Sequence, residues 1–377
     1  MTPSTGPRPY PRFSDEEMSR RRAALATELE AAGTAHALLY GANRAGPAVG
    51  WLTRWPVTRE ALVVFTPGEQ DLLLVNFYNH IPNAERIATE AAVRWAGPKP
   101  MATAIEELDR RGARGERVAV IGPLGYRPYA ALAEFGKPVP LDDGYTRLRL
   151  RKSPEELDWL RIGCGFTDDA VRAVHEGAGP GTDERELGNL AERAYVGRGG
   201  TTHIHYFGVP VPSQWPAART LRQGDVLSCE LSASYWDYAG QLLRTFAVAD
   251  DPLPLFRELH QVADAAFDAL FERVRPGATA AELVAASAVI GDAGFTTRDD
   301  LVHGFVGGYL PPVIGDTTRL LEDVADFTLE EGMTIVIQPN VVTSDESAGV
   351  QTGELVAVTH DGAERLHDYE RGVLRIG

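Results

Sequence analysis

A short pattern of residues occurs twice in the second half of the chain. A Pro-Gly turn, a helix-capping residue and a Glu-Leu pair occupy residues 180–187 and again residues 276–283. In both copies a glutamate stands three positions after the capping residue, as in the capping box of a helix start. Residues 223–228 and 331–336 then each place a glycine turn before an apolar strand. The repeated order predicts a domain built from two related α/β halves.

The first part of the chain predicts a smaller α/β domain. Residues 15–32 space their apolar side chains as an amphipathic helix does, and a glycine, a common helix terminator, follows them. Short apolar runs predict strands, and one more helical stretch lies between them. The strands are expected at residues 36–40, 61–65, 71–75 and 117–121, and the helix at 101–111.

A basic stretch at residues 147–152 predicts an extended connection between two domains. Ser153 and Pro154 follow it and are residue types favoured at the N-cap and in the first turn of a helix. The expected divisions are a disordered lead at residues 1–12, an N-terminal domain at 13–147 and a second domain at 148–377. In the second domain, helices are expected at residues 154–174, 183–196, 255–274 and 279–293, and strands at 226–231, 242–248, 334–337 and 355–359.

The charge of the chain restricts its partners. The 37 Lys and Arg residues against 53 Asp and Glu residues give a formal net charge of -16. Nucleic acids and anionic membranes need a positive protein surface, so neither is expected as a partner, and a small molecule is. Cys164 and Cys229 are too few for a disulfide framework, which favours a reducing, cytoplasmic compartment.

Several short segments follow one another in the order found in a known family. The sequence resembles the pita-bread proteins, which include methionine aminopeptidase, aminopeptidase P, prolidase and creatinase. The resemblance implies a creatinase/prolidase-like N-terminal α/β domain, a pseudo-twofold pita-bread domain and a homodimer whose subunits complete each other's active sites. The segments that carry the resemblance are residues 152–156, 224–227, 244–246, 303–305 and 331–333.

The positions that bind metal in this family have changed. Its metallopeptidases hold two metal ions with two Asp, one His and two Glu. The resemblance places Glu230, Gln241, His303, Gln338 and Gly353 at these five positions, with Glu354 one residue beyond the last. Carboxamides keep the shape of carboxylates but not the negative charge that holds cations. We therefore expect no dinuclear site and no cofactor; the alternative is a single divalent metal on Glu230 and His303 together with His205 or His203.

The remaining polar groups suggest a site for chemistry. An acidic residue in the apolar strand 226–231 costs free energy unless it is paired or functional. Glu230 is therefore expected to be the nucleophile or general base, unless it pairs with Arg244 on the next strand. His303 is expected to be its acid/base partner, and Glu354 is the third catalytic candidate. Cys229 should point away from Glu230 and pack in the core.

Five more residues are expected to contact the substrate. His203 and His205 should share one face of a strand, because side chains alternate with a period of two. The others are Gln241, Gln338 and Arg244.

These residues predict a hydrolase of a C–N bond, in an amide or amidine, acting on a small amino-acid-like substrate without the dinuclear metal site. Creatinase has a glutamate where this chain has Leu243, so creatine hydrolysis is not implied. Two alternatives remain open. One is a non-catalytic pita-bread protein that binds a small molecule or peptide. The other is an Xaa-Pro-type metallopeptidase with a rebuilt mononuclear metal site.

Overall fold

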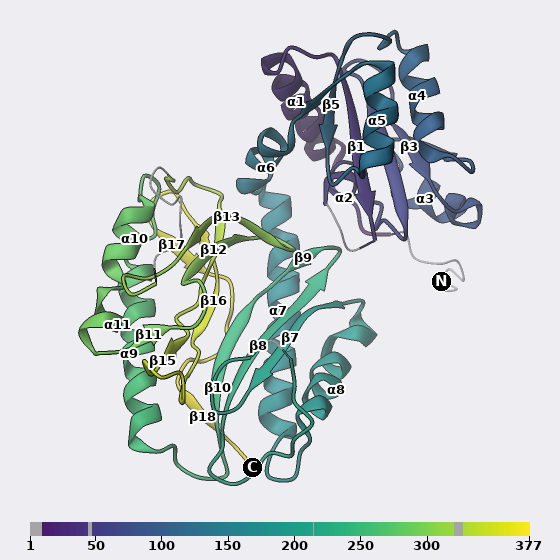
Figure 1. Cartoon of the computed structure of the whole chain (residues 1–377). Coiled ribbons are helices and arrows are strands. Elements are labelled where there is room, and N and C mark those ends of the chain that lie inside the picture. The colour runs from purple at the N-terminus through teal and green to yellow at the C-terminus, as the bar shows by residue number, and fades with distance from the viewer. Residues whose placement is uncertain (1–9, 44–46, 214, 320–326) are drawn as a thin grey trace, which may run out of the picture. The chain divides into compact units, whose positions relative to one another are not determined.

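The computed structural model describes residues 10–43, 47–213, 215–319 and 327–377. The chain forms two compact units, Met1–Arg149 and Leu150–Gly377 (Figure 1). Most of the predicted lead at residues 1–12 lies outside the described residues, so it stays a prediction. Within the described residues, no helix has the length and apolar character that a membrane crossing requires.

The end of the first unit differs from the prediction. Residues 147–150 are helical and belong to α6 (Asp142–Leu150) instead of an extended connection. Acidic residues lie in the first turn of this helix and Arg147 and Arg149 lie in its last turn, which complements the helix dipole. The N-cap Ser153 and Pro154 of the next helix are confirmed, with a full capping box to Glu156.

The N-terminal unit contains a mixed six-stranded sheet in the order β4-β3-β2-β1-β5-β6. Strands β1, β2 and β3 are antiparallel neighbours, while β4, β5 and β6 each pair in parallel with a neighbour. Buried apolar side chains on the strands and on α4 form its core. Its other elements are α1 (Asp15–Ala31), β1 (His36–Ala42), α2 (Ala48–Thr53), β2 (Glu60–Phe65), β3 (Leu72–Val75), η1 (Tyr78–His80), α3 (Ile81–Ile87), β4 (Ala92–Trp95), α4 (Pro100–Arg110), β5 (Arg117–Ile121), α5 (Tyr126–Phe135) and β6 (Lys137–Pro140).

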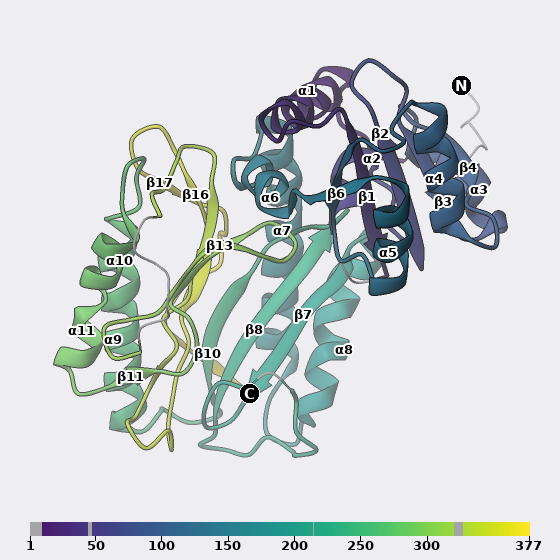
Figure 2. The same cartoon turned by 45° about the horizontal axis from the view of Figure 1, so that its top comes forward.

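The C-terminal unit contains a ten-stranded sheet with the main path β13-β12-β14-β16-β10-β8-β7. Figures 1 and 2 show α7 and α8 beside the β7, β8 and β10 half, and α9 to α11 beside the other half. The helices are α7 (Pro154–Gly177), α8 (Glu184–Tyr195), η2 (Val196–Arg198), α9 (Pro254–Phe271), α10 (Ala280–Ala286) and α11 (Ala288–Asp292). The strands are β7 (Thr201–Gly208), β8 (Val226–Tyr235), β9 (Tyr238–Ala239), β10 (Leu242–Val248), β11 (Thr296–Thr297), β12 (Val302–Phe305), β13 (Tyr309–Ile314), β14 (Thr334–Ile337), β15 (Val341–Val342), β16 (Gly353–Val358), β17 (Ala363–Arg365) and β18 (Val373–Ile376).

The single helix predicted at residues 279–293 is two helices, α10 and α11, which meet at Ser287. The Ser287 hydroxyl donates to the Val284 carbonyl oxygen at 2.7 Å, and its backbone N–H donates to the same residue. A side chain that bonds to the helix backbone competes with the regular pattern, and the turn tightens here.

The predicted internal repeat is confirmed by equivalent backbone contacts. Asp183 forms an isolated antiparallel bridge with Thr220, and Thr279 forms the corresponding bridge with Thr328. Both capping residues accept a hydrogen bond from the next helix, but only Thr279 completes a capping box with Glu282. The Asp183 carboxylate instead accepts hydrogen bonds from the backbone N–H and the side chain of Arg185. In both halves the helix therefore starts beside an equivalent loop, although the capping differs in detail.

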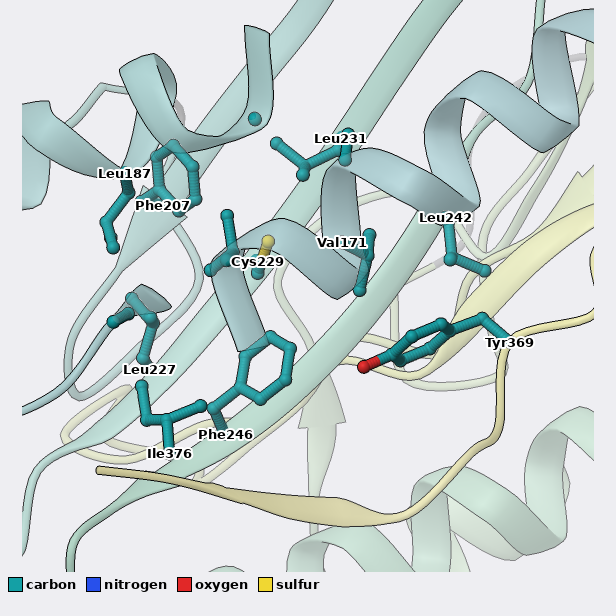
Figure 3. Packing of buried hydrophobic residues seen from close by; sticks show 14 of the residues in the cluster. Val171, Leu187, Phe207, Leu227, Cys229, Leu231, Leu242, Phe246, Tyr369 and Ile376 are labelled. Carbon is teal, nitrogen blue, oxygen red and sulfur yellow. The ribbon is translucent and has the colours of Figure 1, made fainter. Parts of the chain in front are cut away.

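The two faces of β8 carry different side chains. Leu227, Cys229 and Leu231 pack in a core with Val171 of α7, as Figure 3 shows. The even-numbered residues, among them Glu230, point to the opposite side. We call the two sides of the sheet the α7 face and the Glu230 face. The prediction that Cys229 is a packing residue is confirmed, and burial raises the pKa of its thiol, which keeps it neutral.

Candidate active site

Glu230 lies near the middle of β8 and is partly buried. Its Oε1 accepts a hydrogen bond from Gln241 Nε2 at 2.8 Å, and its Oε2 lies 3.5 Å from Gln351 Nε2. Burial and the charge of Asp299 raise the pKa of Glu230 to about 7, and the hydrogen bonds from the two amides only partly offset this rise. A carboxyl group with this pKa is a competent base near neutral pH, because it is ionised but still binds a proton well.

Two carboxamides join Glu230 to the other half of the sheet. Gln241, which is fully buried, also donates from Nε2 to Gln338 Oε1 at 3.2 Å. Gln338 Nε2 in turn donates to the backbone carbonyl oxygen of Asp300 at 3.1 Å. These bonds fix the orientation of both amides. Gln241 Oε1 then has no hydrogen-bond partner within the described residues.

His303 is fully buried on β12 and pairs with Val336, which is two residues before Gln338 on the neighbouring strand. It therefore lies on the Glu230 face. Its Nδ1 is 3.1 Å from the carbonyl oxygen of Gly304. A carbonyl only accepts, so Nδ1 carries the proton and Nε2 carries a lone pair. Burial lowers the pKa of His303 to about 4, although its contacts with Gly304 and Gln338 and the charge of Asp299 act in the opposite direction, so the imidazole is neutral at physiological pH.

Two aspartates that sequence reasoning missed lie beside these groups. Asp300 is buried, and its Oδ1 accepts a hydrogen bond from the Tyr309 hydroxyl at 3.2 Å. The Tyr309 ring stacks on His303 at 4.0 Å between centroids. Burial and the neighbouring Asp299 raise the pKa of Asp300. Their signal in the sequence was two adjacent acidic residues directly before the strand that carries His303.

The prediction that His203 and His205 share a face is wrong. A β-bulge between Thr202 and Ile204 adds a residue to β7 at His203 and reverses the alternation on one side of it. His205 pairs with Leu231 of the α7 face, and its Nε2 lies 2.9 Å from the Tyr195 hydroxyl of α8. The His203 ring instead lies 5.7 Å from Phe305, whose ring is 5.6 Å from His303.

Arg244 and Glu354 lie on the α7 face and not beside Glu230. Arg244 pairs with Cys229 and Glu354 with Leu242, both of which belong to the core on that face. Both side chains are fully buried and form an ion pair, with Arg244 Nη2 2.9 Å from Glu354 Oε2. The expected roles of Arg244 in substrate binding and Glu354 in catalysis therefore have no support in their position. The alternative pairing of Arg244 with Glu230 is also wrong.

The Arg244–Glu354 pair has its remaining groups satisfied. Arg244 donates to the carbonyl oxygens of Leu243, Gly353, Tyr369 and Glu370 at 2.6–2.9 Å. Burial alone would raise the pKa of Glu354, but a hydrogen bond from Arg365 and the charge of Arg244 outweigh it and lower the pKa. This is the pattern of a buried structural ion pair.

The residues on the Glu230 face do not fit the ligand set of a dinuclear metal site. Gln241 places an N–H group against the Glu230 carboxylate, where a second carboxylate would be needed. Gly353 pairs with Leu243, and Leu243 pairs with Glu230, so all three positions share one face of the sheet. A Cβ atom at Gly353 would be only 2.5 Å from the Ile337 carbonyl oxygen. A glutamate there would displace the backbone.

No group of three or more His, Cys, Asp or Glu within the described residues is arranged to hold a metal ion. The alternative single site on His205, Glu230 and His303 is wrong, because His205 faces the other side of the sheet. The expectation that the protein uses no cofactor stays a prediction.

The fold of the C-terminal unit and the polar residues on one face of its sheet define a pita-bread protein of the aminopeptidase, prolidase and creatinase class. Residues 158–360 match metallopeptidase family M24, and the chain belongs to this family.

Similar proteins agree with this assignment. The chain is 27% identical over 274 residues to an Xaa-Pro dipeptidase from Pyrococcus furiosus. The aligned part covers 69% of this chain and 76% of that protein. The solved prolidase from Pyrococcus horikoshii OT3 has a TM-score of 0.80 at 21% identity and covers 94% of this chain and 100% of its own. The solved structure of an Xaa-Pro dipeptidase from Bacillus anthracis has a TM-score of 0.82 at 17% identity, and the match covers 95% of this chain and 100% of that one. The predicted fold class is confirmed, and the named relatives are hydrolases.

Proposed function

We propose that this protein hydrolyses a C–N bond in a small amino-acid-like substrate, with Glu230 as the general base and without a dinuclear metal site. The observation that carries the proposal is the Glu230 carboxyl group, which is partly open, hydrogen-bonded to Gln241 and raised in pKa to about 7. Membership of a hydrolase family and the replacement of carboxylates by Gln241 and Gln338 support it.

The chemistry follows from the protonation states of these side chains. Glu230 removes a proton from a water molecule, whose oxygen attacks the carbon of the C–N bond. When the bond breaks, the proton passes from Glu230 to the leaving nitrogen. Neutral His303 accepts a hydrogen bond at Nε2 and so orients the water or a substrate N–H group. His303 was expected to be an acid/base partner. Because its pKa is about 4, the ring is not an imidazolium at neutral pH, and its proposed role is that of a hydrogen-bond acceptor and not of an acid.

Hydroxyl groups next to Glu230 support a polar reaction centre. Ser228 and Ser232 lie two residues on either side of it and therefore on the same face. Both are buried, and neither hydroxyl has a hydrogen-bond partner within the described residues. Such hydroxyls can donate to the oxygen that becomes negative during attack on an amide, which lowers the barrier.

The test is hydrolysis in the presence of a chelator. The dipeptides Gly-Pro and Ala-Pro and a panel of amidine compounds are incubated with protein in EDTA, and release of amine is followed. We expect turnover of at least one compound, lost about 10²-fold or more in Glu230→Gln. The matched control is Glu364→Gln, because Glu364 is exposed on β17 and forms only a surface ion pair. Turnover that needs added Mn²⁺ and stops in EDTA would contradict the proposal, and binding without turnover would favour the non-catalytic alternative.

The expected homodimer also stays a proposal. It is tested by sedimentation of the full chain at micromolar concentration, where a subunit mass of 40.9 kDa distinguishes monomer from dimer directly.

A further inference from the structure

Besides the hydroxyls of Ser228 and Ser232, three further buried polar atoms around Glu230 lack hydrogen-bond partners within the described residues. They are Gln241 Oε1, His303 Nε2 and Asp300 Oδ2. Gln241 and His303 are 0% exposed and Asp300 is 6% exposed. Buried polar groups in folded proteins are normally paired, so several unpaired groups close together need an explanation such as a bound molecule or ion.

All three atoms are hydrogen-bond acceptors. The amide nitrogen of Gln241 is fixed by its bonds to Glu230 and Gln338, so the free atom is its oxygen. The Nδ1–H of His303 faces a carbonyl, so the free Nε2 carries a lone pair. Asp300 Oδ2 accepts when the carboxyl group is ionised. A molecule that satisfies this set must bring several donors.

The three atoms belong to one connected group of side chains. Gln338 bridges Gln241 to the backbone of Asp300, at 3.2 and 3.1 Å. The Tyr309 hydroxyl donates to Asp300, and its ring stacks on His303. The residues that carry the free acceptors therefore form one connected cluster on the Glu230 face.

Three carboxyl groups of this cluster have no counter-charge among the described residues. Glu230, Asp299 and Asp300 act on one another electrostatically. None of the three forms an ion pair with a residue in the described ranges, although many other carboxylates of the chain do. Arg244, a buried cation of this unit, is held on the opposite face by Glu354. A positively charged molecule would offset this repulsion.

Aromatic rings complete the surroundings. Tyr309 is 52% exposed and lies over His303, and Phe305 lies between the rings of His303 and His203. The faces of aromatic rings attract cations and tolerate the flat shape of a guanidinium group.

We propose that the Glu230 face binds a nitrogen cation rich in N–H groups, an ammonium or amidinium group of the substrate, through Glu230, Asp300, Gln241 and His303. The proposal rests on the proposed function only in taking the bound molecule to be the substrate. The cation is held by charge-assisted hydrogen bonds, which are the strong ones. Its attachment to the reacting part of the molecule brings the C–N bond to Glu230.

The test compares two small probes of equal shape. Methylguanidinium is a cation with five N–H groups, and methylurea is its neutral counterpart with a carbonyl oxygen in place of one nitrogen. Binding of each to the full chain is measured by calorimetry. We expect methylguanidinium to bind at least about tenfold tighter, which corresponds to one unit of log Kd. Methylammonium, measured alongside, tells whether a planar or a tetrahedral cation fits better.

Variants locate the site. Asp300→Asn and Glu230→Gln should each reduce the preference for the cation to less than about threefold, because each removes one negative charge. Asp361→Asn, in an exposed turn after β16, should keep the full preference. Circular dichroism checks that each variant is folded. Because Glu230 is partly exposed, Glu230→Gln should fold and still tests the proposal if Asp300→Asn unfolds.

Each outcome has a distinct meaning. Equal binding of the two probes, absence of binding by both, or a preference that survives in both variants overturns the proposal. A preference for the cation in a protein that hydrolyses nothing leaves this binding site in place and overturns the proposed hydrolase. Hydrolysis of a neutral substrate, with no preference for the cation, overturns the cation site and leaves the proposed hydrolase in place.

Discussion

His203 and His205 lie on opposite faces of β7, although only one residue separates them. The bulge at His203 places its ring near Phe305, while His205 contacts the Tyr195 hydroxyl behind the sheet. Two side chains that sequence alone would pair therefore belong to different environments. One is exposed near the proposed site, and the other is part of the contact between β7 and α8.

These positions predict different consequences for two matched substitutions. His205→Ala should lower the free energy of unfolding by about 0.5–1.5 kcal/mol, because the Tyr195 hydroxyl loses one of its two hydrogen-bond partners and keeps Thr202. His203→Ala should change it by less than about 0.5 kcal/mol, because the side chain is exposed. Urea unfolding of both variants measures this. A larger loss in His203→Ala than in His205→Ala would contradict the placement of the bulge.

The pKa of Glu230 predicts how activity depends on pH. Because this pKa is raised to about 7, the carboxylate form that accepts a proton disappears as the pH falls below 7. His303 stays neutral over the same range. The value of kcat/KM should therefore rise about tenfold per pH unit below 7 and level off above it. A flat profile between pH 5 and 8 would show that Glu230 is not the base.

The fold could be read from the sequence where the signals are local. The Gly turns and capping residues of the two halves are short-range patterns, and the structure shows their equivalent bridges at Asp183 and Thr279. The side of the sheet that Cys229 occupies follows from strand alternation next to Glu230. Glu354, one residue beyond Gly353, lies on the opposite face of the sheet for the same reason.

The site could be read only in part, because it depends on register between distant strands. Arg244 faces away from Glu230 since β8 and β10 pair Cys229 with Arg244, and no local pattern reveals that pairing. The bulge in β7 likewise exists only against its partner strand. Asp300 belongs to the site through a tyrosine hydroxyl nine residues away along the chain.

The buried Arg244–Glu354 pair predicts a large effect on stability. Glu354→Gln leaves the Arg244 and Arg365 guanidinium groups without a counter-charge and should cost about 3–5 kcal/mol of unfolding free energy. Glu364→Gln, which breaks an exposed pair with Arg161, should cost less than about 1 kcal/mol. Urea midpoints at constant m-value measure both. Equal small losses would mean that the buried pair contributes little beyond a surface one.

A second buried pair predicts that stability depends on pH. His367 Nδ1 lies 2.7 Å from Asp168 Oδ1. Burial would lower the pKa of His367, but nearby Cys164 and the Asp168 carboxylate outweigh it and raise the pKa to about 10. The folded pKa therefore exceeds the unfolded value of about 6.5. The contribution to stability is full below pH 6.5 and is lost as the pH rises towards 10.

The Asp168→Asn variant isolates this contribution. At pH 6 it should be less stable than the wild type by about 1–3 kcal/mol, because it weakens the hydrogen bond to a buried charge. The difference should shrink between pH 6.5 and pH 9, as the wild type loses the same interaction. Unfolding in urea at the two pH values measures it. A difference that grows with pH would mean that His367 is neutral in the folded protein.

The replaced positions on the Glu230 face predict how far a metal site can be rebuilt. Wild-type protein purified without chelator should hold much less than one metal ion per subunit, because two carboxamides contribute no charge. The double variant Gln241→Asp with Gln338→Glu supplies two carboxylates beside Glu230 and His303, and it should bind one Mn²⁺ ion, measured by elemental analysis after dialysis.

A second ion is not expected, because a side chain at Gly353 would meet the Ile337 carbonyl oxygen. Gly353→Glu added to the double variant should therefore lower the urea midpoint without raising the metal content. Two ions per subunit in the triple variant would show that the backbone at Ile337 yields easily, and stoichiometric metal in the wild type would show that the amides are no barrier.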